Sequence, residues 1–307
     1  MENRSRTVSP PTFANEAEKR AFVAACDQQL EDRMEALAAR IAEDENLHFI
    51  GLTGPSCAGK TTAAHKLTHV LEAHGHRVHV ISIDDFYYDK EYLLTLSKND
   101  PEGDIDYDSE ATIDVSLLEE KVQSLLEGKV TQLPRFDFHS GFRCDGKIIT
   151  PEKGDVFLFE GIQILYPSVR AILERGGYRS IYICPASSIT AGGVTFAPNR
   201  IRLLRRLVRD SIYRSSQAPF TFFLWKSVRE NEDQNIFPYV HLCNEVLDST
   251  CAYEIGMLKP YLQNLLKDFP RDDKKYEVAQ EILSQIADVQ EISSDYITEN
   301  SLYKEFI

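Results

Sequence analysis

The chain has 307 residues, of which 43% are hydrophobic and 27% are charged, as in a soluble globular protein with a sizeable core. Its formal net charge of −14 disfavours nucleic acid as a partner, because an acidic surface repels phosphates. No apolar run approaches membrane-spanning length, and the polar start does not resemble a secretory signal. The six cysteines are scattered without a C-x-x-C pair, so we expect no zinc or disulfide framework, no membrane partner and a cytoplasmic location.

The first predicted elements are a polar segment and a helix. Residues 1–12 are polar, and we expect no packed structure there. Apolar residues at steps of three and four predict an amphipathic helix over 15–45. That helix packs either on the main domain or on a partner chain, which leaves a homo-oligomer open.

The central part of the chain alternates between strand and helix patterns. The expected elements are strand 47–53, helix 60–74, strand 78–83, helix 114–127 and strands 155–160 and 180–184. Such alternation is typical of an α/β fold in which helices cover both faces of a central parallel sheet.

Two later segments depart from the alternation. Extended stretches at 130–138 and 147–150 flank a turn and predict a hairpin-like insertion over 129–151. A turn at Gly192 and Gly193 precedes an arginine-rich helix over about 199–213, and the remainder is largely helical. The predicted organisation is an N-terminal tail and helix (1–46), a main α/β domain (47–268) and a C-terminal helical extension (269–307), with further helices at 252–268 and 274–288.

The most informative motif lies between the first predicted strand and the helix after it. Residues 54–61, Gly-Pro-Ser-Cys-Ala-Gly-Lys-Thr, fit G-x-x-x-x-G-K-[ST], the phosphate-binding loop. Glycines let the backbone wrap a triphosphate with its N–H groups pointing inward, at the positive end of a helix. Lys60 is expected to reach the outer phosphates of the nucleotide, and the Thr61 hydroxyl to ligate Mg²⁺. The predicted nucleotide-binding residues of the loop are Gly54, Pro55, Ser56, Cys57, Ala58, Gly59, Lys60, Thr61 and Thr62.

Acidic residues end two predicted strands near this loop. Asp84 follows strand 78–83, where a carboxylate can ligate magnesium or accept a proton from an incoming hydroxyl. The neighbouring Asp85 is interpreted as a helix cap. Glu160 ends strand 155–160 in the place of a Walker B carboxylate, which holds magnesium directly or through water. Thr61, Asp84 and Glu160 are therefore candidate metal ligands, and Asp84 and Lys60 are candidate catalytic residues.

Four arginines lie on one face of the predicted helix over 199–213. Arg202, Arg205, Arg206 and Arg209 are spaced i, i+3, i+4 and i+7. Like charges at this spacing repel by about a few tenths of a kcal/mol per pair, so something anionic is expected against them. Salt bridges to carboxylates of the chain are one interpretation. The other is a lid over 199–216 that closes on the triphosphate and stabilises charge in the transition state.

Together the motifs resemble the uridine–cytidine kinase family, within the uridine kinase/phosphoribulokinase group of P-loop kinases. The resemblance covers about 47–250 and rests on the loop and on residues 82–87, 107–108, 134–138, 158–161 and 202–210. The C-terminal half more closely resembles a bacterial uridine-kinase-like subgroup, whose members end much as residues 301–307 do. The resemblance implies transfer of the γ-phosphoryl group of Mg-ATP to the 5′-hydroxyl of a small-molecule acceptor, a uridine- or cytidine-like nucleoside.

Carried over by position, the resemblance also implies individual roles. Asp84 deprotonates the 5′-hydroxyl, Asp108 binds the ribose hydroxyls, and Tyr87 lines the sugar site. Glu160 and Thr61 hold magnesium. Lid residues on phosphates and acceptor are Arg206, Arg209 and Arg214, of which Arg206 and Arg209 are catalytic and Arg209 and Arg214 bind the nucleotide. The implied substrate residues are Asp84, Tyr87, Asp108, Phe136, His139 and Arg206.

The sequence departs from the family pattern on the side of the base. Phe136 replaces a base-reading Tyr, Gly141 stands at a base-contacting His position, and Ser216 replaces a further lid arginine. His139 lies nearby without an assigned role. A site that loses hydrogen-bonding groups rejects analogues less strongly, so the substrate base stays open. The alternatives are a related kinase acting on ribulose phosphate, pantothenate or glycerate, and a nucleotide-dependent regulatory ATPase.

Overall fold

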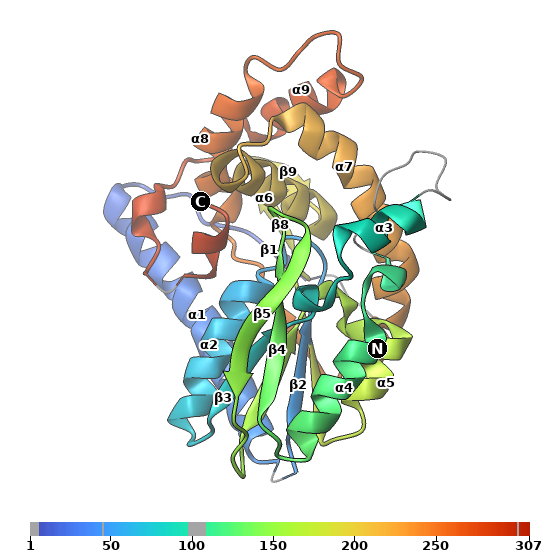
Figure 1. Cartoon of the computed structure of the whole chain (residues 1–307). Coiled ribbons are helices and arrows are strands. Elements are labelled where there is room, and N and C mark those ends of the chain that lie inside the picture. Colours follow the sequence, from blue (N-terminus) through green and yellow to red (C-terminus); the bar gives the residue numbers. More distant parts are fainter. Residues whose placement is uncertain (1–5, 45, 98–108, 300) are drawn as a thin grey trace.

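The computed structural model describes residues 6–44, 46–97, 109–299 and 301–307. Within these ranges five strands form a parallel sheet in the order β10-β7-β2-β6-β3, with helices on both faces (Figure 1). The strands are β2 (Phe49–Thr53), β3 (Val78–Ser82), β6 (Val156–Glu160), β7 (Tyr178–Cys184) and β10 (Glu245–Asp248). The predicted α/β class with a central parallel sheet is confirmed.

Helices on the two faces of the sheet bury two separate cores. They are α1 (Glu16–Ala42) and α2 (Lys60–Ala73) on one side, and α4 (Val115–Leu126) and α5 (Pro167–Leu173) on the other (Figure 1). Successive strand side chains point to opposite faces, so β2 contributes to both cores. Its Ile50 and Leu52 pack with α1 and α2, whereas Phe49 packs with α4 and α5.

The predicted helix over 15–45 is α1, and it packs on the body of the same chain. The Asn15 side chain accepts a hydrogen bond from the Glu18 amide and caps the first turn. Its buried face includes Leu30 and Met34, which belong to the core shared with α2. Of the two packing alternatives, the structure contains the contact with the main domain.

A small second sheet corrects one expectation. The strands β1 (Thr7–Val8), β8 (Ser188–Ala191) and β9 (Val194–Phe196) pair, with a turn at Gly192 and Gly193 between β8 and β9. Both glycines have positive φ, as the tight turn requires. The expectation of no packed structure over 1–12 is wrong for β1, because its backbone pairs with β8. Residues 1–5 lie outside the described part of the chain.

The predicted insertion is an antiparallel hairpin of β4 (Thr131–Asp137) and β5 (Phe142–Ile149). It runs across the front of the molecule in Figure 1. The interpretation of Asp85 as a helix cap is wrong, because its carboxylate accepts a hydrogen bond from the Phe136 amide, at 3.0 Å. Asp85 therefore attaches the hairpin to the turn that follows β3.

The C-terminal half adds helices at the upper end of the view in Figure 1. They are α6 (Pro198–Tyr213), α7 (Ala218–Asn231), α8 (Glu254–Leu266) and α9 (Tyr276–Ile286), and a shorter α3 (Lys90–Ser97) lies beside the hairpin. Leu204 of α6, Leu262 of α8 and Ile282 of α9 share one core. The division at residue 268 stays a prediction, since residues on both sides of it contribute to that core.

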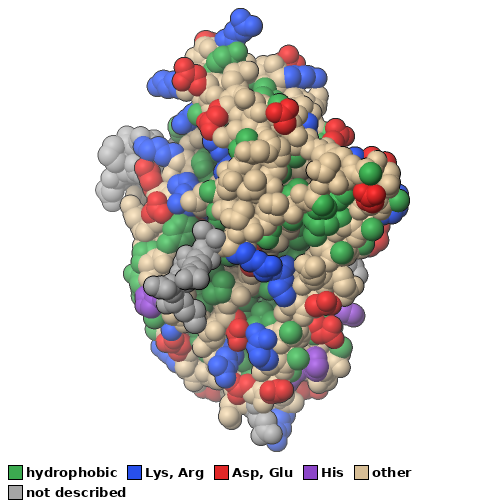
Figure 2. All heavy atoms as spheres, turned by 180° about the vertical axis from the view of Figure 1, so that it is seen from behind, with side chains coloured by type: hydrophobic (Ala, Val, Ile, Leu, Met, Phe, Trp, Pro, Cys, Tyr) green, Lys and Arg blue, Asp and Glu red, His purple; other side chains and the backbone are tan. Residues whose placement is uncertain are grey.

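The surface carries charges of both signs. On the face shown in Figure 2, Lys and Arg side chains are interspersed with Asp and Glu side chains. Across the described ranges, no helix is both long and apolar enough to cross a membrane.

Candidate active site

The predicted phosphate-binding loop connects β2 to α2 at the carboxyl end of the sheet. Gly59 has a φ of +97°, and a Cβ there would lie 2.6 Å from the Leu302 side chain. A Cβ on Gly54 would lie 2.0 Å from the carbonyl oxygen of Ile183. Cys57 also has a positive φ, 59°, which costs a non-glycine residue about 1–2 kcal/mol. The loop thus requires glycine at positions 54 and 59. Between them, the surrounding structure must hold the backbone of Cys57 in its left-handed conformation.

Lys60 and Thr61 begin α2 at the end of this loop. The Lys60 ammonium donates to the carbonyl oxygens of Gly54 (2.9 Å) and Pro55 (3.2 Å), so it lies across the loop. The Thr61 side chain is exposed. Both residues line a cavity of about 650 Å³ that opens beside the loop.

The cavity brings together most of the predicted side chains. Its wall includes Ser56, Cys57, Lys60, Thr61, Asp84, Tyr87, Glu160, Arg206, Arg209 and Arg214. The other loop residues predicted to bind nucleotide, Gly54, Pro55, Ala58, Gly59 and Thr62, lie in the loop or the first turn of α2 without lining the cavity. Asp108 lies outside the described residues.

The two candidate acids stand at the ends of neighbouring strands. Asp84 lies in the short turn after β3, and its carboxylate accepts a hydrogen bond from Gln163 Nε2 at 2.7 Å. The same amide donates to the Tyr87 hydroxyl at 2.8 Å. Gln163 therefore fixes both side chains, a role that the sequence did not indicate. In the sequence, Gln163 could have been found from its position two residues after the Glu160-Gly161 pair.

Glu160 ends β6 and accepts a hydrogen bond from the Ser82 hydroxyl at 2.8 Å. Burial raises the pKa of Glu160, and the carboxylates of Asp84 and Glu305 raise it further. Ser82 and Lys60 act in the opposite direction without reversing the shift. This carboxylate therefore lies in an environment where a cation would be favoured.

The arginines of α6 divide into two groups. Arg202 and Arg205 are buried and pair with Glu232 and Glu254, respectively. For these two the salt-bridge interpretation is confirmed. By contrast Arg206, Arg209 and Arg214 line the cavity.

One carboxylate serves all three cavity-lining arginines. Asp210 lies 3.3 Å from Arg206, 2.6 Å from Arg209 and 3.7 Å from Arg214. Burial lowers the pKa of Arg214, and the like charge of Arg209 lowers it further. This side of the cavity therefore has more guanidinium groups than Asp210 can neutralise, which favours an anionic ligand.

The hairpin supplies an aromatic wall on the Asp84 side. Phe138 is 63% exposed and lines the cavity. Phe136 is only 5% exposed and packs behind it, with ring centroids 5.0 Å apart. His139 lies in the exposed hairpin turn, and neither Phe136 nor His139 belongs to the described cavity wall. Phe138, two residues after the expected position, was missed because it lies just beyond the end of β4, where strand alternation does not predict the direction of its side chain.

Two glutamates of the cavity wall were not predicted. Glu232 follows α7, and its carboxylate accepts the Ser56 amide at 3.1 Å. Glu305 comes from the C-terminal turn Leu302–Glu305, which packs against the start of α2. Glu232 lies in no motif, and the resemblance of residues 301–307 assigned no role to Glu305, so the tertiary fold is what places both at the cavity.

The oxygen donors present suit magnesium. Thr61, Asp84 and Glu160 present hydroxyl and carboxylate oxygens to one cavity, and Mg²⁺ prefers such ligands. Within the described residues, no group of three or more His, Cys, Asp or Glu side chains could hold a metal alone. Because Mg²⁺ usually takes one or two carboxylates and completes its shell with water and substrate phosphates, these residues fit it.

A parallel sheet with a phosphate-binding loop after β2, acids at the ends of two further strands and arginines across the cavity define a P-loop kinase. The chain belongs to the phosphoribulokinase and uridine kinase family. The family profile, described as "Phosphoribulokinase / Uridine kinase family", matches residues 49–190.

Curated relatives agree with this assignment. The chain is 33% identical over 163 residues to a uridine kinase of Lactobacillus helveticus, covering 53% of this chain and 67% of that protein. It is 31% identical over 192 residues to a uridine kinase of Staphylococcus aureus, covering 62% of this chain and 82% of that protein. With uridine-cytidine kinase C of Dictyostelium discoideum it shares 29% identity over 170 residues, which is 55% of this chain and 31% of that protein.

A solved structure also resembles the chain, a possible uridine kinase from Bacillus stearothermophilus. The TM-score is 0.46 at 17% identity, and the match covers 72% of this chain and 100% of that one.

Proposed function

We propose that this chain is an ATP-dependent nucleoside kinase that phosphorylates the 5′-hydroxyl of a uridine- or cytidine-like nucleoside. The observation that carries the proposal is that Lys60, at the phosphate-binding loop, and Asp84, at the end of the neighbouring β3, face one cavity. Phosphates held at the loop and a hydroxyl held at Asp84 would meet there.

In the proposed reaction, Asp84 accepts the proton of the acceptor hydroxyl. The hydroxyl oxygen forms a bond to the γ-phosphorus of ATP, the bond from that phosphorus to the β,γ-bridging oxygen breaks, and ADP leaves. Gln163 holds the Asp84 carboxylate by its 2.7 Å hydrogen bond and so keeps it in one orientation. Positioning of this kind supplies much of the catalysis in phosphoryl transfer.

The phosphate side of the reaction belongs to the loop and to α6. The loop amides and the Lys60 ammonium would bind the β- and γ-phosphates. The cavity-lining Arg206, Arg209 and Arg214 would neutralise charge that develops on the transferred group, with Arg206 and Arg209 acting in catalysis. One such arginine contributes about a thousandfold or more in rate.

Thr61 and Glu160 would hold Mg²⁺, with Asp84 as a further candidate ligand. When bound, magnesium neutralises charge on the β- and γ-phosphates. The raised pKa of Glu160 supports this assignment, because a nearby cation would relieve the cost of ionising that carboxylate.

The acceptor would lie against Tyr87 and the hairpin, whose aromatic rings pack together. Tyr87 and Phe138 line this side of the cavity and offer aromatic surface to a sugar or base. The proposed ribose-binding role of Asp108 stays a prediction, and so do the base-side roles of Phe136 and His139. Because the hairpin contributes an apolar Phe138 to the described wall, a related small-molecule kinase remains a second candidate.

The test is Mg-ATP consumption across uridine, cytidine, adenosine, guanosine, inosine, ribulose 5-phosphate and pantothenate, with the product mass determined. We expect one nucleoside to stimulate turnover and to gain one phosphoryl group at its 5′ position. Asp84→Asn is expected to lower kcat about 100-fold or more while Mg-ATP still binds. Slow hydrolysis that no acceptor stimulates would favour the regulatory ATPase and overturn the proposal.

A further inference from the structure

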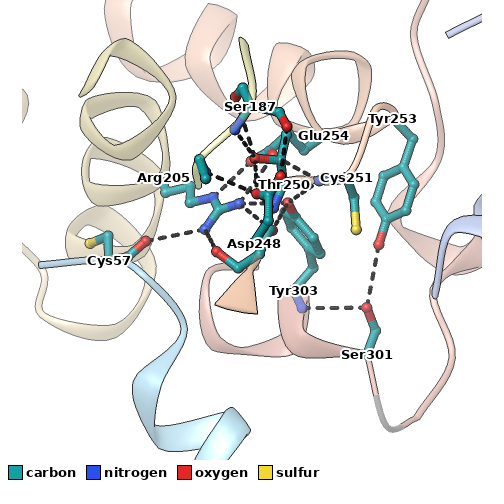
Figure 3. Close-up of polar contacts among 12 residues, drawn as sticks. Cys57, Ser187, Arg205, Asp248, Thr250, Cys251, Tyr253, Glu254, Ser301 and Tyr303 are labelled. Carbon is teal, nitrogen blue, oxygen red and sulfur yellow. Dashed lines mark hydrogen bonds and ion pairs between the residues drawn. The ribbon is translucent and has the colours of Figure 1, made fainter. Parts of the chain in front are cut away.

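The left-handed turn of the phosphate-binding loop is held from behind by α6. Arg205 Nη1 donates to the carbonyl oxygen of Cys57 at 3.3 Å (Figure 3). Cys57 is the non-glycine loop residue with a φ of 59°. A backbone in this region persists only where its surroundings fix it, so the contact falls at the part of the loop that most needs one.

The Arg205 side chain is itself fixed in one orientation. It is 0% exposed, and Glu254 accepts from its Nε (2.7 Å) and Nη2 (3.0 Å). The Tyr303 hydroxyl accepts from Nη2 at 2.7 Å, and the Ser249 carbonyl accepts from it at 3.0 Å. Figure 3 shows the guanidinium with Glu254 and Tyr303 on one side and the Cys57 carbonyl on the other. A planar fork with this many fixed partners has no second orientation available.

Arg205 differs in this respect from the next residue along the helix. Arg206 lines the cavity, whereas Arg205 does not, so Arg205 cannot reach a ligand there. Its charge is matched by Glu254 and not left for an anion. Among the residues that the structure describes, Arg205 contacts the active site through its hydrogen bond to the loop backbone.

We propose that Arg205 is a positioning residue of the phosphate-binding loop, which it holds through the Cys57 carbonyl while Glu254 and Tyr303 fix its guanidinium. The proposal rests on the proposed function, since it assigns these residues to nucleotide binding. A peptide unit held by its carbonyl has its plane fixed, and the amide groups that follow it along the loop are aimed accordingly. The loop from 54–61 is thus oriented by residues of α6, α8 and the C-terminal turn.

An ion pair that only links α6 to α8 would show the same contact between Arg205 and Glu254. The test must therefore separate this structural role from the positioning of the loop. Tyr303→Phe removes one hydroxyl that accepts from Arg205 and keeps the ring. Tyr253→Phe is the matched control, because that buried hydroxyl donates to the Asp27 carboxylate and does not contact Arg205. A double variant, Arg205→Met with Glu254→Met, removes both charges and leaves no buried ion unpaired.

Two readouts are measured on the full chain. The first is the Kd of Mg-ATP by calorimetry, beside the thermal midpoint of each variant. The second is the labelling rate of individual cysteines by a thiol reagent, followed by mass spectrometry. Buried Cys57 reports on the loop, and exposed Cys144 reports on the reagent itself. Partly buried Cys243, which packs with Leu165 and Tyr182, reports on the edge of the sheet away from the substituted residues.

We expect Tyr303→Phe to weaken Mg-ATP binding about fivefold, and the double variant to weaken it more. Both should label faster at Cys57 with unchanged rates at Cys243 and Cys144, and Tyr253→Phe should match the wild type. Unchanged Kd and unchanged Cys57 labelling in both variants would overturn the proposal. So would a joint rise at Cys57 and Cys243, because that pattern reports a general loosening of the fold. The thiol readout needs neither nucleotide nor acceptor, so it separates failure of this proposal from failure of the proposed kinase activity.

Discussion

The Glu305 carboxylate lies 3.4 Å from the amide nitrogen of Thr62 and 3.3 Å from its hydroxyl oxygen. Thr62 lies in the first turn of α2, where free N–H groups and the helix dipole favour an anion. A carboxylate from the C-terminal turn therefore occupies a position that the sequence assigned to the nucleotide. A nucleotide phosphate that approached Thr62 would meet a like charge.

Glu305→Gln is expected to tighten Mg-ATP binding by about two- to fivefold, because an anion at a helix N-terminus is stabilised by about 0.3–1 kcal/mol.

The same change should lower the pKa of Glu160, since Glu305 is one of the groups that raise it. If ionised Glu160 is needed for activity, the acid limb of the kcat/KM profile should lie at lower pH in the variant than in the wild type.

Calorimetry at neutral pH and a rate profile between pH 4 and 8 check the two effects separately. Glu277→Gln, an exposed carboxylate of α9, is the matched control and should change neither. Weaker binding of Mg-ATP in Glu305→Gln would mean that Glu305 supports the nucleotide and does not oppose it.

Arg206→Ala is expected to reduce kcat about a thousandfold. Arg206 lines the cavity, donates to the Ser56 hydroxyl at 2.9 Å and shares Asp210 with two other arginines. Arg200→Ala is the control on the same helix, because Arg200 pairs with the exposed Glu281 and such surface pairs contribute about 1 kcal/mol or less. Steady-state rates decide the matter, and equal losses in both variants would point to damage to α6 as a whole.

Phe138→Ala is expected to raise the KM for the acceptor about tenfold and to leave the KM for ATP unchanged, because aromatic stacking on a base contributes about 1–3 kcal/mol. The control is Phe142→Ala, which removes another exposed aromatic ring of the hairpin that is not on the described cavity wall. Initial rates with each substrate varied in turn provide the measurement. A larger effect on ATP than on the acceptor would contradict the placement of the acceptor beside the hairpin.

The sequence predicted those parts of the fold that depend on local pattern. The strand before residue 54, the helix after it and the acids at 84 and 160 follow from periodicity and motif spacing. The strand β10 was missed because it is short, with four residues, and owes its place to pairing with β7. The strand β1, with two residues, was missed for the same reason.

The arginines of α6 show where local pattern is insufficient. Their spacing placed all four on one face. The salt-bridge interpretation is confirmed for Arg202 and Arg205, whereas the lid interpretation stays a prediction for the cavity-lining Arg206 and Arg209. Spacing could not reveal that Arg205 would meet Glu254, 49 residues away, and Tyr303, 98 residues away. Charge pairing between distant segments is decided by tertiary packing, which no local window contains.

Asp155 is expected to make folding stability depend on pH below the usual aspartate range. Burial raises the pKa of this carboxyl, but hydrogen bonds from Arg77, the Glu152 amide and His79 outweigh burial and lower it to about 2. A depressed pKa stabilises the folded state above the unfolded pKa, about 3.9, and that stability is lost as pH falls through 2. The contribution is about 2 kcal/mol.

Urea unfolding of the wild type and of Asp155→Asn between pH 6 and pH 2 measures this contribution. The difference in unfolding free energy should be largest at pH 6 and shrink toward pH 2. Asp145→Asn, an exposed carboxylate of β5, should give a small difference that does not vary with pH. A constant difference for Asp155→Asn would show that its bonds do not favour the ionised form.

The contacts behind the phosphate-binding loop have a consequence for recombining this chain with its relatives. The family match ends at residue 190, yet Arg205, Glu254 and Tyr303 all lie beyond that point. A chimera that exchanged only the matched segment would place a foreign loop against supports that evolved beside another one. The substrate preference measured for such a chimera would then reflect the displaced loop as well as the exchanged residues. An exchange that keeps the loop in place must therefore also include α6, α8 and the C-terminal turn.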